Sequence, residues 1–202
     1  MKRTKEEAAV TRENLLQAGL VVFGRKGYDA ATLEDVAREA GVTRGAIYWH
    51  FGSKTELFNA LMEKYSSRGG LILQQGASEG GTFTQILTRV FARMLKAVET
   101  DQELLSMMEI SLFKSGYSDP KEDWRMRQVE SNRSLIQGIA DTMKQGIEAG
   151  ALRKDLDPVL AARAFLAFQN GIIYLWLSDP SAFSLGISAD AFAEVYLRGV
   201  QV

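Results

Sequence analysis

Few side chains in this sequence could carry out catalysis. The 202 residues include no cysteine and one histidine, His50. The lack of cysteine excludes disulfide frameworks, thiolate zinc sites and cysteine nucleophiles, and one histidine leaves little from which to build a catalytic triad or a multi-histidine metal site. Carboxylates are plentiful but no spacing marks a catalytic pair, and the glycine-rich stretch at residues 76–81 lacks the features of a phosphate-binding loop. We therefore expect neither an enzyme nor a bound metal or cofactor.

A short aromatic and basic segment at residues 44–50, RGAIYWH, points to a different chemistry. If the segment is helical, Ile47 and Phe51 face a core, four residues apart. The opposite side then carries Arg44, Gly45, Tyr48 and Trp49. An arginine can pair with guanine or hold a phosphate, a tyrosine can contact a phosphate or a thymine methyl, and a glycine lets the backbone approach DNA. Each residue taken singly could equally be structural, but together they favour a face that reads DNA.

The flanking residues could extend this face. His50 and Lys54 follow at its far end, placed for backbone phosphates, while Thr32 and Thr43 stand where two predicted helices begin and where amide groups favour a phosphate. The net charge of −1 argues neither for nor against nucleic acid, but the N-terminal tip is basic through Lys2, Arg3 and Lys5. A local basic patch fits a nucleic-acid footprint, although so few charges are by themselves more typical of a solvated surface.

A helix, a tight turn and a second helix would position these side chains. Thr32 and Asp35 form a capping-box pattern that opens the first helix, and Thr43 caps the second. Gly41, in the turn between them, permits a positive φ. Residues 33–51 therefore predict a helix-turn-helix, whose second helix enters the major groove of DNA.

The rest of the chain follows the helical period almost throughout, without a convincing strand. About nine helices are predicted, beginning near residues 8, 32, 43, 53, 83, 101, 121, 158 and 188, so the fold class is all-α. Gly69 and Gly70 are expected to end the fourth helix, and residues 76–81 and 114–120 to form loops. The apolar stretch at 159–177 is long enough to span a membrane, but Arg163 and its flanking Asp-Pro pairs favour a buried helix.

The N-terminal motifs closely resemble the DNA-binding domain of the TetR family over roughly the first 60 residues. The resemblance rests on Phe23, Gly27 and Tyr28, on Thr32 and Leu33, on Asp35 to Ala37, on Ala40 to Thr43, on Gly45 to Phe51, and on Lys54, Glu56 and Leu57. The run TRGAIYWHF is similar to the subgroup of multidrug-efflux repressors related to the acridine-resistance repressor, and residues 171–185 resemble that subgroup more weakly.

This resemblance implies a DNA-binding domain at residues 1–53 and a ligand-binding and dimerisation domain at residues 54–202. It implies DNA contacts from Thr32, Thr43, Arg44, Gly45, Tyr48, Trp49, His50 and Lys54, with the basic tip reaching the minor groove. The protein is then expected to be a cytoplasmic homodimer, paired through its last two helices and with no membrane association. It would bind a palindromic operator, respond to a small hydrophobic or aromatic effector, and control an efflux system.

Apolar residues of the C-terminal half could line the effector cavity, because apolar walls with a few polar groups suit aromatic or amphiphilic ligands. The candidates are Phe91, Leu95, Met108, Leu112, Met143, Phe165, Phe168 and Gln169. For any one of them ordinary core packing is the commoner explanation.

Three alternatives remain open at this point. The chain could be a DNA-binding regulator or activator with a different effector or with none. It could be a nucleoid-type DNA binder without a ligand. It could also be a small helical enzyme with an incidental helix-turn-helix, although no catalytic motif supports that interpretation.

Overall fold

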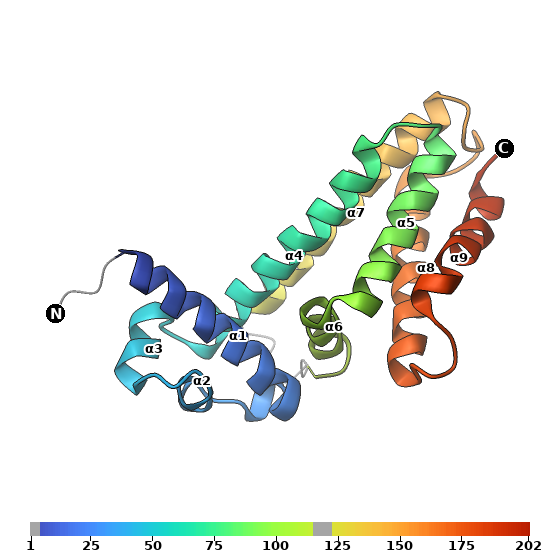
Figure 1. Cartoon of the computed structure of the whole chain (residues 1–202). Helices are drawn as coiled ribbons and strands as arrows, with labels where there is room; N and C mark the ends of the chain where they lie inside the picture. The colour runs from blue at the N-terminus through green and yellow to red at the C-terminus, as the bar shows by residue number, and fades with distance from the viewer. Residues whose placement is uncertain (1–4, 115–122) are drawn as a thin grey trace. The chain divides into compact units, whose positions relative to one another are not determined.

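The computed structural model describes residues 5–114 and 123–202, and most of this part of the chain is helical (Figure 1). Nine α-helices and a short π-helical segment fall within these ranges, where the only β-type pairing is an isolated bridge between Leu152 and Gln201. The predicted all-α class is confirmed, as is the number of helices within the described ranges. Lys2 and Arg3 of the basic tip, and residues 115–120 of the predicted loop, lie outside the described residues.

The chain packs as two compact units. The first comprises Met1–Ser67 with Glu103–Arg125, and the second comprises Arg68–Gln102 with Met126–Val202. Packing thus groups the start of the fourth helix and a segment from the middle of the chain with the N-terminal helices. The predicted division into residues 1–53 and 54–202 is a division by function and stays a prediction.

In the first unit, residues close to the helix ends largely determine where the helices begin and end. Its elements are α1 (Lys5–Ala30), α2 (Leu33–Glu39), α3 (Arg44–His50), the first part of α4 (Lys54–Ser78), most of α6 (Gln102–Glu109) and the π-helical segment η1 (Ile110–Lys114). Gly27 interrupts α1 with a φ of 75°. Thr32 and Asp35 form the predicted capping box of α2, and the side chain of Thr43 caps α3. Each of these signals acts within a few residues of the helix end that it sets.

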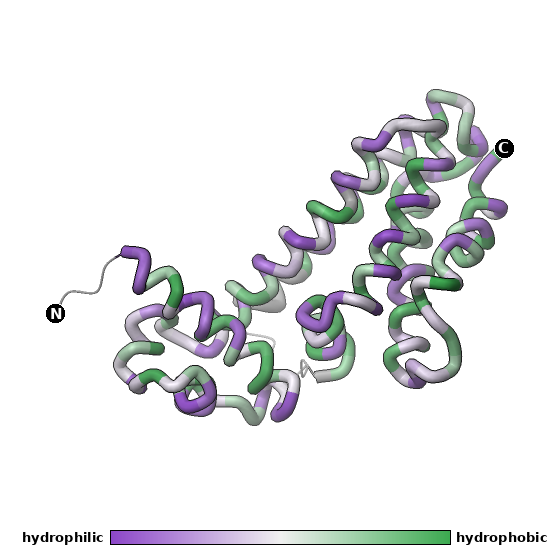
Figure 2. Tube along the Cα trace, viewed as in Figure 1, coloured by the Kyte–Doolittle hydropathy of each residue, from purple (hydrophilic) through white to green (hydrophobic). Residues whose placement is uncertain are grey.

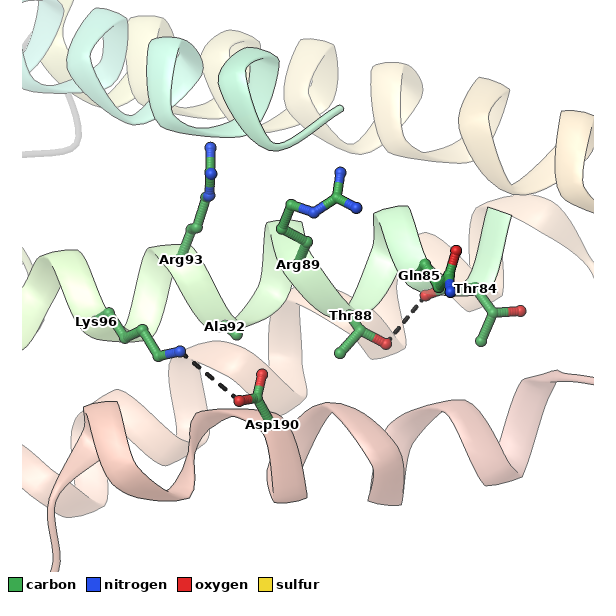
Figure 3. Close-up of a pocket in the computed structure, with 8 residues that line it drawn as sticks. All are labelled: Thr84, Gln85, Thr88, Arg89, Ala92, Arg93, Lys96 and Asp190. Carbon is green, nitrogen blue, oxygen red and sulfur yellow. Dashed lines mark hydrogen bonds and ion pairs between the residues drawn. The ribbon is translucent and has the colours of Figure 1, made fainter. Parts of the chain in front are cut away.

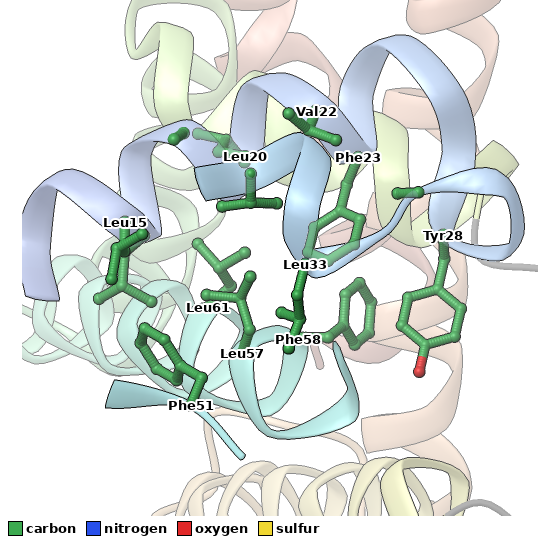
Figure 4. Close-up of a cluster of buried hydrophobic side chains, with 14 of the residues drawn as sticks. Leu15, Leu20, Val22, Phe23, Tyr28, Leu33, Phe51, Leu57, Phe58 and Leu61 are labelled. Carbon is green, nitrogen blue, oxygen red and sulfur yellow. The ribbon is translucent and has the colours of Figure 1, made fainter. Parts of the chain in front are cut away.

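Aromatic side chains from α1 and α4 form the centre of the first unit's core (Figure 4). The rings of Phe23 and Phe58 meet edge-on with centroids 5.6 Å apart, and the rings of Tyr28 and Phe58 meet at 4.8 Å. Ile47 and Phe51, at 0% and 1% exposed, belong to the same cluster. These two anchors fix α3 by one face, which leaves its other face available.

The second unit contains the remaining long helices. These are the rest of α4, α5 (Phe83–Thr100), α7 (Asp123–Glu148), α8 (Pro158–Ser178) and α9 (Leu185–Val200). Gly150 follows α7 with a φ of 72°, a conformation that favours glycine at the end of a helix. Asp157 caps α8 by accepting a 2.7 Å hydrogen bond from the amide of Leu160, with Pro158 in the first turn. Both helix ends were predictable from the sequence.

The expected break at Gly69 and Gly70 is wrong, because α4 continues through both residues to Ser78. The packing of a third glycine shows what such a residue does in this helix. A β-carbon at Gly76 would lie 3.0 Å from Cγ2 of Val90 on α5. Glycine therefore allows α4 and α5 to approach closely within the second unit, and its cost in helix propensity is outweighed by packing.

The last helix begins three residues earlier than expected, at Leu185 rather than Ser188. Ser184 caps it by accepting a 3.1 Å hydrogen bond from the amide of Ile187. The carboxylate of Glu99, on α5, also accepts hydrogen bonds from the first amides of α9. This second cap comes from a distant part of the sequence, so the local pattern could not reveal it.

The α8 helix, with 21 residues, is apolar and long enough to cross a membrane by length and composition alone. Seven of its residues are buried in the second unit, among them Phe165, Gln169 and Trp176. Packing within the unit accounts for one face of α8 and leaves its exposed apolar residues to be explained.

Candidate DNA-binding site

The turn between α2 and α3 sets the orientation of α3. Gly41 adopts a φ of 66°, and the amide of Val42 donates a 2.9 Å hydrogen bond to the carbonyl of Ala37. Thr43 then accepts a 3.2 Å hydrogen bond from the amide of Ala46, which starts α3. With Ile47 buried in the core, the helix is held at its start and along one face, which is the arrangement of a helix-turn-helix.

The other face of α3 is aromatic, basic and exposed. Trp49 is 74% exposed, Tyr48 is 42% exposed, and the side chain of Arg44 is 73% exposed. Gly45 adds open space to this face, because no atom lies within 4 Å of the position of a β-carbon there. A tryptophan this exposed contributes little to the stability of the unit. The structure therefore brings together four of the predicted DNA contacts on one free surface.

Glu34 of α2 joins this surface, although no motif in the sequence selects it. Its Oε1 lies 3.0 Å from Nε of Arg44 and accepts a 3.1 Å hydrogen bond from the hydroxyl of Tyr48. The guanidinium of Arg44 also lies 5.4 Å from the centre of the Tyr48 ring. One carboxylate thus contacts the two side chains best suited to contact DNA. The contact spans residues that are ten and fourteen positions apart, so only the packing of α2 on α3 reveals it.

Lys54 is more enclosed than its predicted role suggests. Its ammonium donates to the carbonyls of Tyr28 at 2.8 Å and Asp29 at 3.0 Å, and it lies 4.5 Å from the centre of the Tyr28 ring. These bonds tie the start of α4 to the end of α1. An ammonium group has three donors, and the two carbonyls use two of them.

Thr32 and His50 lie at the edges of the site. The hydroxyl of Thr32 donates a 2.9 Å hydrogen bond to Asp35, which also pairs with Lys26 at 2.8 Å and with Arg38. The Lys26 ammonium, together with the hydrogen bonds from Thr32, holds the pKa of the Asp35 carboxyl well below its usual range. His50 is partly buried, and its ring meets that of Trp49 edge-on at 4.6 Å. Asp35 therefore fixes α2, and through it the position of Glu34.

Comparison with known proteins identifies the family of the chain that carries this site. Residues 15–61 match the family described as "Bacterial regulatory proteins, tetR family", and residues 83–202 match "MAATS-type transcriptional repressor, C-terminal region". The chain is 32% identical over 200 residues to the HTH-type transcriptional regulator AcrR of Shigella flexneri, covering 98% of this chain and 92% of that protein. The chain belongs to the TetR family. The expected family is thereby confirmed, and this TetR-family protein is a transcription regulator rather than an enzyme.

Solved structures agree with this assignment along the whole chain. NalD, the secondary repressor of the MexAB-OprM multidrug efflux pump in Pseudomonas aeruginosa, has a TM-score of 0.84 at 26% identity and covers 98% of both chains. SmeT, the repressor of the Stenotrophomonas maltophilia multidrug efflux pump SmeDEF, has a TM-score of 0.80 at 26% identity in its complex with triclosan. That match covers 96% of this chain and 92% of SmeT. The TetR-like fold is therefore shown for both the helix-turn-helix and the C-terminal helices.

The residues predicted to bind an effector fall in both units of the TetR-family chain. Met108 and Leu112 lie in the first unit, on α6 and η1. The other six lie in the second unit, on α5, α7 and α8. Leu95 and Met143 are fully buried, at 0% exposed. Leu112 is 37% exposed, so the predicted set contains both core and surface positions.

Four of the aromatic and polar candidates meet within the second unit. The ring of Phe91 contacts those of Phe165 at 5.4 Å and Phe168 at 5.9 Å. The buried amide of Gln169 donates a 3.3 Å hydrogen bond to the carbonyl of Phe91. Tyr196 of α9, which the predicted set omits, stacks on Phe168 with centroids 6.2 Å apart. These contacts form an aromatic cluster shared by α5, α8 and α9.

Tyr196 is anchored in this cluster by its hydroxyl, which donates a 2.9 Å hydrogen bond to the carbonyl of Ala161. Burial raises the pKa of Tyr196 to about 12. Its place on the same face of the last helix as Phe192 was visible in the sequence, but its ring partners on α8 were not.

A surface pocket of about 580 Å³ lies along α5, and most of the residues that line it are polar or charged (Figure 3). Its lining residues are Thr84, Gln85, Thr88, Arg89, Ala92, Arg93, Lys96 and Asp190. Arg89 and Arg93 point toward α4 and both pair with Glu79, which directly follows that helix, and Lys96 lies 3.7 Å from Asp190. Its charges are already paired within the chain, so this pocket does not suit the apolar effector that the sequence predicts.

Proposed function

We propose that this TetR-family protein represses an efflux operon by binding a palindromic operator as a homodimer, and that a small apolar or amphiphilic effector releases it. The observation that carries the DNA-binding part is the free face of α3, where exposed Trp49 and Tyr48 stand beside Arg44 on a helix whose opposite side is buried. Thr32, Thr43, Gly45, His50 and Lys54 complete the proposed contact set. A helix held in this way presents side chains to the major groove while the core keeps its orientation.

The test compares two arginines that occupy similar environments. Arg44 pairs with Glu34, and Arg25 pairs with Glu39 at 3.2 Å, so each arginine bonds a glutamate of α2 at the surface. Replacing Arg44 with alanine is expected to weaken operator binding about 5- to 150-fold, the range for loss of one bidentate contact to a base. Arg25→Ala removes the same charge away from α3 and is expected to change affinity much less.

The measurement is fluorescence anisotropy with labelled DNA from upstream of the protein's own gene, against a scrambled duplex of equal length. Equal losses in Arg44→Ala and Arg25→Ala would contradict the proposed reading face. A wild-type protein that binds both duplexes equally would contradict operator recognition itself.

The exposed apolar residues of α8 and α9 support the proposed dimer. On α8 they recur every three or four residues at Leu160, Ala164, Ala167, Gly171 and Leu175. On α9 they recur at Ile187, Ala191 and Val195. Ile187 is 88% exposed and Leu160 and Leu175 are 64% and 63% exposed, values that leave large apolar surfaces in water.

Figure 2 shows hydrophobic residues running along both helices. Two neighbouring helices, each with an apolar stripe, can pair with a second copy to form a four-helix bundle, and the small residues of α8 permit close approach. We therefore assign the dimer interface to α8 and α9. A symmetric dimer would present two copies of α3 to successive major grooves about 34 Å apart.

The dimer is tested by placing a charge in the stripe. Leu175→Glu is expected to shift the protein toward monomer in sedimentation velocity and to weaken operator binding. Leu135→Glu, at a 41% exposed leucine of α7, is the matched control and should leave the dimer intact. An unchanged dimer in Leu175→Glu would refute the proposed interface.

We propose that the effector contacts those residues predicted from the sequence that lie in the second unit. They are Phe91, Leu95, Met143, Phe165, Phe168 and Gln169. Their support is the aromatic cluster with one buried amide in the second unit, a combination that suits an aromatic ligand with a polar group. Triclosan, present in the SmeT complex, is a suitable probe.

Triclosan is expected to stabilise the protein against heat and to release the operator. Phe168→Leu should weaken both effects, whereas Phe183→Leu, which alters the separate aromatic pair with Phe192, should not. Operator binding that no aromatic compound disturbs would favour a regulator with a different effector or with none. Because the chain is similar to bacterial transcription regulators, which act on DNA in the cytoplasm, we infer that the protein is cytoplasmic.

A further inference from the structure

We propose that Glu34 contributes to DNA specificity by disfavouring contacts of Arg44 and Tyr48 with DNA phosphates more than their contacts with a matching base edge. This inference rests on the proposed function, because it concerns the same reading face. It adds a negatively charged residue to a surface whose other polar side chains are hydrogen-bond donors. Glu34 is thus assigned a contact role that neither composition nor helical spacing suggests.

The geometry carries the inference. The same carboxylate oxygen of Glu34 lies 3.0 Å from Arg44 Nε and 3.1 Å from the Tyr48 hydroxyl. The Glu34 side chain is 42% exposed and that of Arg44 is 73% exposed, so the contact lies at the surface and DNA can reach it. A surface ion pair of this kind is weak enough to exchange with another acceptor.

Glu34 has no part in capping its helix. The neighbouring residue Asp35 performs that function with Thr32. A change at position 34 can therefore be made without removing the capping box. The carboxylate of Glu34 contacts only the reading side chains among the hydrogen bonds and ion pairs described for it.

The chemistry of the two kinds of DNA acceptor explains the discrimination. A phosphate is negatively charged, so an arginine that binds it beside Glu34 brings two negative charges close together, which weakens that contact. A guanine edge is uncharged and offers two acceptors, O6 and N7, in the geometry of an arginine. Arg44 can therefore bind guanine while Glu34 stays nearby. Glu34 therefore weakens a phosphate contact, which every DNA sequence offers, more than it weakens a contact with a base edge.

The experiment measures Kd for the operator and for a scrambled duplex in wild type, Glu34→Gln and Glu39→Gln. The control removes the same charge from the same helix, at a residue that pairs with Arg25 instead. Glu34→Gln is expected to tighten binding to the scrambled duplex about two- to five-fold, the range for releasing one exposed ion pair. Operator binding should tighten less, so the ratio of the two affinities falls.

Salt dependence gives a second readout. If Arg44 gains a phosphate in Glu34→Gln, the slope of log Kd against log salt on the scrambled duplex should steepen by about 0.9. In an Arg44→Ala background the effect of Glu34→Gln should shrink to that of Glu39→Gln, because no arginine is released. Circular dichroism verifies that each variant keeps its helices.

Three results would overturn the proposal. Equal tightening in Glu34→Gln and Glu39→Gln would show a general effect of charge. Weaker operator binding with unchanged scrambled binding would show that Glu34 itself accepts from a base. A wild-type protein without operator preference would overturn the proposed function and with it any specificity role, whereas the first two results leave the proposed function standing.

Discussion

Replacing Glu99 with alanine is expected to destabilise the protein by about 2–3 kcal/mol. The carboxylate of this α5 residue accepts hydrogen bonds from the amides of Leu185 at 3.1 Å and Gly186 at 2.7 Å, and from the hydroxyl of Ser184 at 3.1 Å. Hydrogen bonds to a charged group are each worth about 1.5–3 kcal/mol. Because Glu99 is only partly buried, water can replace much of what is lost, which places the expected cost well below the sum of the three bonds.

The conservative substitution separates the charge from the hydrogen bonds. Glu99→Gln keeps an acceptor oxygen but loses the charge at the N-terminus of α9, so about 1 kcal/mol is expected. The assay is urea unfolding followed by circular dichroism at a fixed protomer concentration, since dimerisation would otherwise alter the result. In thermal unfolding the alanine variant should lose about 4–12 °C for a chain of this size.

A control and a coupled change sharpen the test. Glu194→Ala removes a glutamate of α9 that pairs only with exposed Arg198, so a change within about 0.5 kcal/mol is expected. A β-carbon at Gly186 would lie 2.6 Å from the Glu99 carboxylate. Gly186→Ala should therefore destabilise the wild type but be neutral or stabilising in Glu99→Ala, where the clash is gone. Additive effects of the two substitutions would refute the capping argument.

Three further predictions concern packing and pH. Gly146→Ala should cost about 1–3 kcal/mol in urea unfolding because the new β-carbon would lie 2.5 Å from the Phe83 ring, whereas Gly138→Ala, in open space on the same helix, should stabilise by about 0.5–1 kcal/mol. The lowered pKa of Asp35 means that its stabilising contribution is present above its ordinary pKa of 3.8 and is lost as pH falls below it, so Asp35→Asn should flatten the acid limb of a stability–pH curve. The pKa of Tyr196, raised to about 12, means that its contribution is present below pH 10 and is lost between pH 10 and 12, and Tyr196→Phe should remove this loss in thermal unfolding.

The elements that the sequence predicted best are those whose signals are local. Thr32 and Asp35 lie three residues apart and close the capping box between themselves, and Asp157 stands immediately before Pro158. The positive φ of Gly41 turns the chain without help from a distant residue. In each case the residue and the feature that it sets are neighbours in the chain, so no knowledge of packing was required.

The features that the sequence did not reveal depend on contacts between distant residues. Glu99 caps a helix that begins 86 residues later. Gly76 is needed because Val90 of the neighbouring helix α5 leaves no room for a β-carbon. Gly69 and Gly70 were expected to end α4, yet the helix continues. Glycine has a low helix propensity, but tertiary packing decides whether a helix ends there.

The same distinction applies to the candidate DNA site. The side chains on its surface could be predicted from the sequence, but the residues that they contact could not. Type and spacing were sufficient to place Arg44 and Tyr48 on one exposed face, because a helix turns by a fixed angle per residue. They could not show that both side chains contact Glu34, or that Lys54 donates to the carbonyls of Tyr28 and Asp29. These partners matter for binding because every donor already bonded within the protein must exchange its acceptor before it can contact DNA.

That exchange links the stability of the site to its selectivity. The two carbonyl bonds of Lys54 join α1 to α4 and use acceptors at the end of a helix, so breaking them would loosen the unit that holds α3. The contact between Glu34 and Arg44 joins only two exposed side chains, so it can open while the core stays intact. We therefore expect Lys54 to contact a phosphate without leaving its two carbonyls, and Arg44 to change partner when DNA binds. On this proposal α1 and α4 keep their positions, and rearrangement is confined to the exposed side chains of α3.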